Sequence, residues 1–435
     1  LDMAMKNYFY LYIDGQFGYG LATSKDLQST FYTVDSSTTI GSYNATDFPS
    51  FVGTITPNQA SNGLVQYKPV FASNLILSPN DWEYNWPKRA VFSVGGDSWN
   101  LNVSRDRLSW GNSHIGNFIF DNHLDYLDYL RFDTFSPKFK FESLFVFLTP
   151  YPNQTTGSSE QIDTGVRIFM AHRFEFVIFN ALKLSLDEGL MYYNKNGSLN
   201  LAYLNPSSLY HNLSDRNLFN AIASLELDYS FAPRWKAYLQ FCMDQAKSTN
   251  EEENNAEPNA MGISGGLSFV NTVGKGTYTT NLEGAVTSPA LYRRDKVDFV
   301  IAQRHIRFTT IDKAFYYVYD YLGFPYGGDA VVLQWENSFK RDSWQLEANF
   351  VSVLHGDTSM FTDLTTVNAS TLLGNNTLYW TNVGTLKGSY EWENLHLTGT
   401  CEMDVIGKTD YDKSNRSFDS WSWDTQFVFG VKYVL

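Results

Sequence analysis

The densest group of polar and aromatic side chains lies between residues 105 and 112, where the chain reads Arg-Asp-Arg-Leu-Ser-Trp-Gly-Asn. Two guanidinium groups, a carboxylate, an amide and an indole can together hydrogen-bond hydroxyl groups and stack on flat apolar surfaces, which is the chemistry that binds a sugar. The same set also suits paired charges that brace the inside of a protein, because a buried charge without a partner is strongly destabilising.

The sequence contains no comparable pattern of residues for binding a metal or a nucleotide. The seven histidines are dispersed, and no two of them stand four residues apart, as zinc ligands on one helix do. Two cysteines, Cys242 and Cys401, are too few for a thiolate metal site or a disulfide scaffold. No glycine-rich nucleotide loop occurs. We therefore expect no metal, no cofactor and no enzymatic activity, while a carboxylate pair for glycoside hydrolysis would leave no sequence signature.

The balance of charge narrows the class of protein further. The 435 residues include 32 Lys and Arg against 46 Asp and Glu, a net charge of -14, which excludes a basic nucleic-acid binder. Apolar residues make up 43% and charged residues 18%, which predicts a folded chain. No run of about 18 apolar residues occurs, so no membrane-spanning helix is expected.

Alternation of apolar and polar residues is the dominant pattern of the chain. Between Asn394 and Val405 the odd positions are apolar or small and the even positions are polar. The same period recurs in segments that begin near Leu225, Trp235, Tyr278 and Trp344. A period of two predicts β-strands with one apolar and one polar face.

Roughly sixteen to eighteen such strands can be counted, many longer than the five or six residues usual in globular proteins. Membrane barrels need about ten residues per crossing, and their wall carries aromatic residues at both interfaces. Aromatic residues near predicted strand ends are Trp82, Trp86, Trp380, Trp392, Trp421, Trp423 and the run Phe315, Tyr316, Tyr317, Tyr319 and Tyr321. We predict an all-β fold, a transmembrane antiparallel β-barrel with a lumen plug or inserted loops, as one domain over 1–435. A soluble β-sandwich is the alternative.

The end of the chain carries a further signal. From Trp423 to Leu435 the odd positions are mostly bulky and apolar, and the ending with Gly430, Tyr433 and Leu435 resembles the C-terminal signal read by the bacterial outer-membrane assembly machinery. The chain begins at Leu1, and we expect a secretory signal peptide to have been removed. The predicted location is the bacterial outer membrane, with lipid and the assembly machinery as partners, no nucleic acid, and a monomeric barrel.

Three other expectations concern loops and thiols. Residues 22–63 are rich in Ser, Thr and Asn, which predicts a loop, a periplasmic segment or a lumen plug. The acidic stretch from Lys247 to Pro258 predicts a solvated surface loop, with an ion-binding loop as the alternative. Cys242 lies on the polar face of its strand and Cys401 on the apolar face, so the two thiols should point to opposite sides of the wall.

Four separated stretches, in chain order, resemble one family. They are residues 105–112 followed by Gly116-Asn117 and Leu130-Arg131, then His172-Arg173 with Glu175, then His211 to Asn220, and finally Leu322 to Asp329. Together they are similar to the Wzi-type capsule-assembly proteins, outer-membrane β-barrels that act as lectins holding capsular polysaccharide at the cell surface. Residues 123–127 replace the proline-containing turn that follows the first block in this family's pattern.

The resemblance implies that the polar residues of these blocks are buried in or near the lumen, where we expect them mainly to fix an interior plug and the barrel shape, while glycan contact falls mostly to extracellular loops. These residues are Arg105, Arg107, Trp110, Asn112, His172, Arg173, Glu175, His211, Asp215, Arg216 and Asp329. It also implies a non-enzymatic protein whose partner is a surface polysaccharide. Two alternatives stay open, a porin or substrate-selective channel and a secreted all-β glycan-processing enzyme.

Overall fold

A computed structural model gives the fold of the chain. It describes residues 2–5, 8–21, 39–40, 43–44, 71–73, 82–124, 126–149, 165–194, 196–200, 203, 205, 210, 218–245, 258–293, 297–308, 313–358, 371–374 and 376–433. Within these residues the regular elements whose bounds are described are strands and one 3₁₀ turn, η5 (Glu393–Leu395). Within these residues no helix has the length and apolar character that a membrane span requires.

The strands are β1 (Asp2–Met5), β2 (Phe9–Leu21), β3 (Thr39–Ile40), β4 (Tyr43–Asn44), β5 (Phe71–Ser73), β6 (Trp82–Gly95), β7 (Trp99–Asp106), β8 (Leu127–Phe135), β9 (Phe139–Leu148), β10 (Val166–Phe179), β11 (Leu182–Asn194), β12 (Phe219–Ala232), β13 (Trp235–Gln245), β14 (Ala260–Val273), β15 (Gly276–Thr287), β16 (Val300–Phe308), β17 (Lys313–Tyr321), β18 (Ala330–Arg341), β19 (Trp344–His355), β20 (Thr377–Trp392), β21 (Leu397–Asp412), β22 (Ser417–Phe418) and β23 (Ser422–Tyr433).

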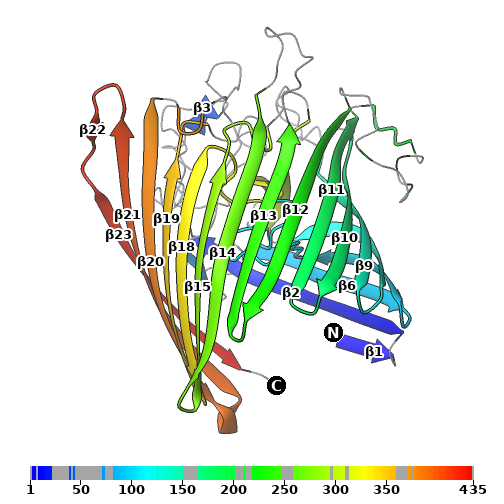
Figure 1. Cartoon of the computed structure of the whole chain (residues 1–435), viewed down its shortest axis with the longest axis horizontal. Coiled ribbons are helices and arrows are strands. Elements are labelled where there is room, and N and C mark those ends of the chain that lie inside the picture. Colours follow the sequence, from blue (N-terminus) through cyan, green and yellow to red (C-terminus); the bar gives the residue numbers. More distant parts are fainter. Residues whose placement is uncertain are drawn as a thin grey trace.

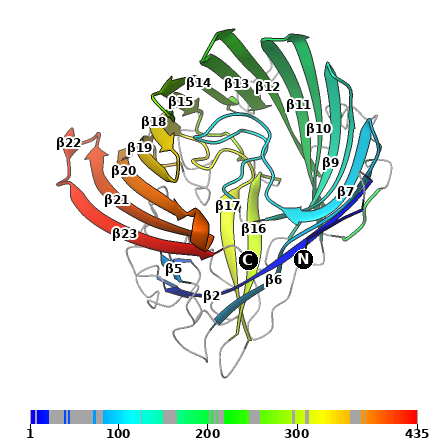
Figure 2. The same cartoon turned by 90° about the horizontal axis from the view of Figure 1, so that it is seen from below.

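The long strands form one curved antiparallel wall (Figures 1 and 2). Its order is β2, β6 to β15, β18 to β21 and β23. This series agrees with the lower end of the roughly sixteen to eighteen strands predicted. Within the described chain no pairing joins β23 to β2. The hairpin of β16 and β17 is not inserted between β15 and β18, which pair directly with each other, and the end of β16 pairs with β6 at Arg307–Glu83 and Phe308–Trp82.

The two ends of the barrel differ in their connections. At one end the strands are joined by short turns such as residues 180–181, 233–234 and 342–343. At the other end lie the long connections, and both termini lie at the short-turn end (Figure 1). In outer-membrane barrels short turns face the periplasm and long loops face the exterior, which orients this chain.

The two faces of the wall have opposite character. On β13 the buried Gln240 lies between Leu239 and Phe241, which are exposed on the outside. On β23 the outward Phe429 is 75% exposed. An apolar exterior of this extent is stable against hydrocarbon and unstable in water, whereas the interior is polar. The predicted alternation is confirmed, and the fold is a membrane-spanning β-barrel of the outer-membrane type.

Aromatic side chains gather at both ends of the wall. At the short turns the ring pairs are Tyr390 and Trp392, Phe339 and Trp344, and Trp235 and Phe269. At the other end Trp380 contacts Trp421, with ring centroids 5.3 Å apart. These positions match the interfacial girdles of membrane barrels. The side chains of Trp82, Trp86 and residues 315–319 lie outside the described part.

Several other expectations can be located. Both cysteines are free, with Cys242 buried and Cys401 exposed, so their predicted placement on opposite faces is confirmed. Gly430 and Tyr433 lie on β23, whereas Leu435 lies outside the described residues. Of residues 22–63 only the short strands β3 and β4 are described, and residues 247–257 are outside the description.

The opposite character of the two faces predicts that an introduced charge is tolerated on the inner face and not on the outer face. Leu386, near the middle of β20, is 61% exposed on the outer face, and its neighbour Thr385 faces the interior, where it donates a hydrogen bond to Asp404. We expect Leu386→Arg to destabilise the barrel by about 2–4 kcal/mol, and Thr385→Arg much less, because only the first substitution places a charge in hydrocarbon. Denaturant unfolding in lipid vesicles measures both. Equal losses would contradict the assignment of faces.

Candidate functional site

Residues 107–126, which connect β7 to β8, leave the wall and run through the interior of the barrel (Figure 2). We call this segment the plug. It packs against the segments that flank the β16–β17 hairpin. Tyr292 Oη donates to the carbonyl oxygen of Phe118 at 2.7 Å and accepts from the backbone N of Phe324 at 3.0 Å. Apolar side chains from these segments form a buried core inside the barrel.

Two glycines allow the plug to turn. Gly111 and Gly116 have φ values of +130° and +131°, a region that favours glycine. A Cβ atom at Gly111 would lie 2.0 Å from Asn117 Oδ1, and one at Gly116 would lie 2.3 Å from Pro325. Glycine is therefore required by the local backbone at both positions.

Arg173 on β10 is the centre of a buried charged network beneath the plug. Its side chain is 3% exposed. Nη1 donates to Asp187 Oδ1 and Oδ2 at 3.0 Å each, Nη2 donates to Glu226 Oε2 at 2.9 Å, and Nε donates to Glu175 Oε1 at 2.7 Å. Lys183 Nζ, 3.4 Å from Glu175 Oε2, offsets part of the surplus negative charge. One guanidinium group thus holds three strands of the wall together.

The plug joins this network through two residues of the first block. Trp110 Nε1 donates to Glu142 Oε1 at 2.7 Å, and the Trp110 ring lies 5.8 Å from the guanidinium carbon of Arg173. Asn112 Nδ2 donates to Glu226 Oε1 at 3.2 Å and also to Asp228. The first and second blocks, separated by about sixty residues in the chain, therefore meet in the lumen.

A carboxylate on another part of the wall holds the middle of the plug. Glu283 Oε2, on β15, accepts from the backbone N of His114 at 2.8 Å and of Ile115 at 3.0 Å, and from Ser113 Oγ at 3.3 Å. Hydrogen bonds from amides to an ionised carboxylate are stronger than neutral ones. The plug is therefore attached to both β12 and β15.

The two arginines of the first block lie in different surroundings. Arg105 makes a two-pronged ion pair with Asp128, with Nε and Nη2 at 2.7 and 2.8 Å from the carboxylate oxygens, and it lies over the Tyr126 ring. Arg107 is exposed, which differs from the expectation that it is buried. The plug begins at Arg107, and its backbone N donates to Asp106.

His172 lies on the outer face of the wall rather than in the lumen. Neighbouring residues of a strand point to opposite faces, and Arg173 points inward. His172 is buried because Tyr210, from the long β11–β12 connection, stacks on it with ring centroids 4.4 Å apart and a 3.1 Å contact between Tyr210 Oη and His172 Nε2. The resemblance had placed His172 with the lumen residues.

Asp329 lies apart from the Arg173 network, at the long-loop end. It is fully buried with φ of +57°. Its Oδ1 accepts from the backbone N of Leu373 at 2.7 Å, its Oδ2 accepts from that of Thr358 at 3.3 Å, and its own N donates to the Ser288 carbonyl at 3.1 Å. Asp329 therefore ties three loops together.

The remaining block residues, His211, Asp215 and Arg216, lie outside the described part of the chain. In contrast, the buried carboxylates that accept from the plug or from Arg173 were not singled out from the sequence, with the exception of Glu175. Glu142, Asp228 and Glu283 accept from the plug, Asp187 accepts from Arg173, and Glu226 accepts from both. Each is an acidic residue on a strand whose side chain faces the interior, and this pattern was the only available signal.

His123, near the end of the plug, lies between two acidic side chains. Its Nδ1 is 2.9 Å from Asp121 Oδ2 and its Nε2 is 3.2 Å from Asp320 Oδ1. Burial alone would lower the pKa of the imidazole, but the charges of Asp320 and Asp121 outweigh it and raise the pKa to about 9. The ring is therefore charged at neutral pH and links the plug to β17.

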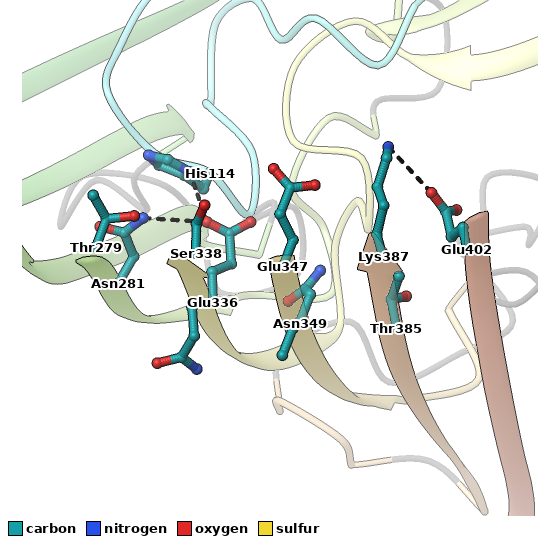
Figure 3. A pocket seen from close by; sticks show the side chains of 12 residues that line it. His114, Thr279, Asn281, Glu336, Ser338, Glu347, Asn349, Thr385, Lys387 and Glu402 are labelled. Atoms are coloured by element: carbon teal, nitrogen blue, oxygen red, sulfur yellow. Dashed lines mark hydrogen bonds and ion pairs between the residues drawn. The ribbon is translucent and has the colours of Figure 1, made fainter. Parts of the chain in front are cut away.

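A polar pocket of about 390 Å³ lies beside the plug, against the inner face of β15 and β18 to β21 (Figure 3). His114 reaches it from the plug, and its Nδ1 lies 2.8 Å from Glu336 Oε2. The hydrogen bond to Glu336 raises the pKa of His114. On the far side Lys387 Nζ pairs with Glu402 at 3.2 Å. The size is within the usual range of ligand pockets.

Residues 262–266 spell G-x-S-x-G, but they lie inside the wall strand β14 and so lack the strand-to-helix turn of a nucleophile elbow. No group of three or more His, Cys, Asp or Glu residues gathers at metal-binding distance in the described ranges.

No family model matches the sequence, and no curated protein matches it. Several solved structures are similar. Wzi of Escherichia coli, described as an outer-membrane protein involved in group 1 capsule assembly and a carbohydrate-binding β-barrel, is 11% identical, with 82% of this chain and 77% of Wzi covered and a TM-score of 0.49. The outer-membrane channel DcaP of Acinetobacter baumannii is 9% identical, with 99% of each chain covered and a TM-score of 0.39. OmpT, an outer-membrane protein of Vibrio cholerae, is 10% identical, with 81% and 89% covered and a TM-score of 0.35.

The faces of the wall and the inward segment, rather than these similarities, define the class of this protein. It is an outer-membrane β-barrel with part of its lumen occupied by a segment of its own chain. The site is the plug, its network of ion pairs and the pocket beside it.

The network predicts that removing its central cation is strongly destabilising. Arg173→Met would leave Asp187 and Glu226 buried without their partner, and we expect a loss of about 3–5 kcal/mol. The matched control is Arg107→Met, which removes an exposed arginine and should change stability by no more than about 0.5 kcal/mol. Denaturant unfolding of the detergent-purified protein compares them. A small effect of Arg173→Met would show that the network does not support the barrel.

The raised pKa of His123 predicts a pH-dependent stability. The stabilisation from its ion pairs is fully present below the ordinary pKa of 6.5, and it is lost as the pH rises through about 9. We expect up to roughly 3 kcal/mol to disappear across this window. Melting temperatures from pH 6 to 10 should fall more in the wild type than in His123→Asn. The control His396→Asn, at a periplasmic turn, should keep the wild-type profile, and identical profiles for all three proteins would refute the assignment.

Proposed function

We propose that this protein is a non-enzymatic outer-membrane barrel that binds or anchors a surface polysaccharide and helps to assemble it at the cell surface. The observation that carries the proposal is the plug, which is fixed to carboxylates on separate parts of the wall. A segment held in this way supports a rigid platform at the membrane rather than a wide passage. The four sequence blocks that resemble capsule-assembly proteins point to the same function.

The long connections at the exterior end, rather than the buried ion pairs, are the proposed contact region for the polysaccharide. Every nitrogen of the Arg173 guanidinium group already donates to a carboxylate of its own network, and the side chain is 3% exposed, so a ligand would have to displace an existing ion pair. The net charge of -14 favours a neutral or amine-bearing glycan over a strongly anionic one. We further propose that the barrel acts as a monomer inserted by the outer-membrane assembly machinery.

Deleting the gene in the source bacterium tests this proposal. We expect the polysaccharide attached to cells to fall and the released polysaccharide to rise, with the total amount unchanged, because anchoring rather than synthesis is lost. The reintroduced wild-type gene is the control. Unchanged retention would contradict the proposal, and hydrolysis of the polysaccharide by the purified protein would favour an enzyme.

A channel is the second candidate, and the polar pocket beside the plug favours it, because polar side chains line an open space in that sector of the lumen. Conductance in a planar lipid bilayer separates the two functions. A plugged platform should give little current, whereas a channel should give stable conductance steps.

A further inference from the structure

Another pocket, of about 290 Å³, lies at the short-turn end of the barrel, where β1 and the start of β2 meet the β6–β7 turn (Figure 1). We call it the mouth pocket, and its main lining residues are Tyr8, Tyr10, Ser93, Trp99, Asn100 and Phe135. Its volume is close to the lower end of the usual range for ligand pockets, so it suits a small ligand.

Strand register places the mouth pocket on the inner face of the wall. Glu142, which accepts from the plug, lies opposite Asp133, and Asp133 lies opposite Asn100, so the Asn100 side chain points inward. Tyr10 lies opposite Ser93, whose Oγ donates to Asn100 Oδ1 at 2.8 Å. The pocket therefore belongs to the periplasmic mouth of the lumen and not to the lipid-facing surface.

The aromatic rings of the mouth pocket are exposed on the face of the wall that is otherwise polar. Tyr8, Tyr10 and Phe135 are between 37% and 57% exposed, and Phe135 shares the inward face of Asp133, two residues before it. Rings of the interfacial girdles face lipid, so the girdle does not account for these three. Apolar surface left in water gains free energy when a ligand covers it.

Polar groups without partners lie beside these rings. Within the described part of the chain, Trp99 Nε1 and Asn100 Nδ2 donate to no acceptor, and Tyr8 Oη has no hydrogen-bonding partner. No residue that lines the mouth pocket carries a charge. An acyl chain would leave these N–H groups unpaired, and a charged ligand would find no opposite charge in the lining. A pyranose ring matches the site, because it has flat apolar faces edged by hydroxyl groups.

We propose that the mouth pocket binds an uncharged pyranose unit, which stacks on the aromatic rings while its hydroxyl groups accept from Trp99 Nε1 and Asn100 Nδ2. The site lies at the opposite end of the barrel from the exterior connections, so it goes beyond the proposed function. Two glycans supply this chemistry on the periplasmic side. One is the N-acetylated glycan of the cell wall, and the other is a polysaccharide on its way to the cell surface.

Fluorescence titration of the detergent-purified full-length protein tests this site. An environment-sensitive dye is attached to the thiol of the Asp97→Cys variant, in which the exposed Cys401 is also replaced by Cys401→Ser. Asp97 lies in the β6–β7 turn, so the dye reports on the mouth pocket and not on the exterior connections. The probes are cellotriose, triacetylchitotriose and sorbitol, which has hydroxyl groups but no ring. We expect a saturable response to at least one trisaccharide and none to sorbitol. Tighter binding of triacetylchitotriose would identify the cell-wall glycan as the source, and tighter binding of cellotriose would identify the polysaccharide.

Variants of one ring separate stacking from a structural role. In the dye-labelled protein Tyr8→Ala should weaken binding about three- to tenfold, whereas Tyr8→Phe, which keeps the ring, should retain most of it. The matched control is Tyr390→Ala, which removes an exposed tyrosine at the same end of the barrel but on its outer face, and it should bind like the parent protein. Heat-modifiable migration in gels confirms that each variant is folded.

The proposal is overturned if neither trisaccharide gives a saturable response, if sorbitol gives an equal one, or if Tyr8→Ala binds as tightly as the parent protein. If the dye reports no sugar binding while gene deletion still releases polysaccharide, only this inference is wrong. If the dye reports binding while retention of polysaccharide is unchanged by the deletion, only the proposed function is wrong.

Discussion

The interior of this barrel depends on one constraint, that a charge removed from water must be matched by a partner. Arg173 meets it with three carboxylates from β10, β11 and β12, and the plug adds hydrogen bonds from amides and an indole to acidic side chains of the wall. Because those acids belong to different strands, satisfying them fixes the path of the plug and the curvature of the wall together. The position of the plug and the shape of the wall therefore depend on each other.

The outer face follows the opposite rule. Lipid supplies no hydrogen bonds, so outward side chains are apolar and the strands satisfy their backbone groups by pairing with one another. His172 is the instructive exception, because a polar ring on that face is tolerated where Tyr210 covers it and contacts its Nε2. Tyr210 thereby takes the place of lipid over this part of β10.

Much of the wall could be predicted from the chain alone. Alternation is a local property, so it identified the strands, their faces and the opposite placement of Cys242 and Cys401 without knowledge of the partners. The pairing of Trp110 with Glu142 or of Ser113 with Glu283 could not be predicted, because it joins residues far apart in the chain and any inward acid was an equal candidate. The exposure of Arg107 was missed for a similar reason, since the segment turns inward only after that residue. The charge of the pocket beside the plug depends on whether Lys387 pairs with Glu347 or with Glu402. Sequence spacing does not distinguish the two carboxylates, because each lies directly opposite Lys387 on a neighbouring strand.

The direct pairing of β15 with β18 has a consequence for how such a molecule can diversify. Residues 288–329 are inserted between two strands that are neighbours in the wall. The pairing of β15 with β18 runs without a break from Thr277–Lys340 to Thr287–Ala330 and does not involve the inserted residues. Because the entropy of loop closure changes only logarithmically with length, a change in the length of this segment would leave the register of β15 and β18 intact, although its contacts with the plug would have to be rebuilt. Its inner members, Tyr292 and Phe324, contact Phe118 instead. The extent to which the lumen is filled can therefore change during evolution while the strands that form the membrane wall keep their pairing.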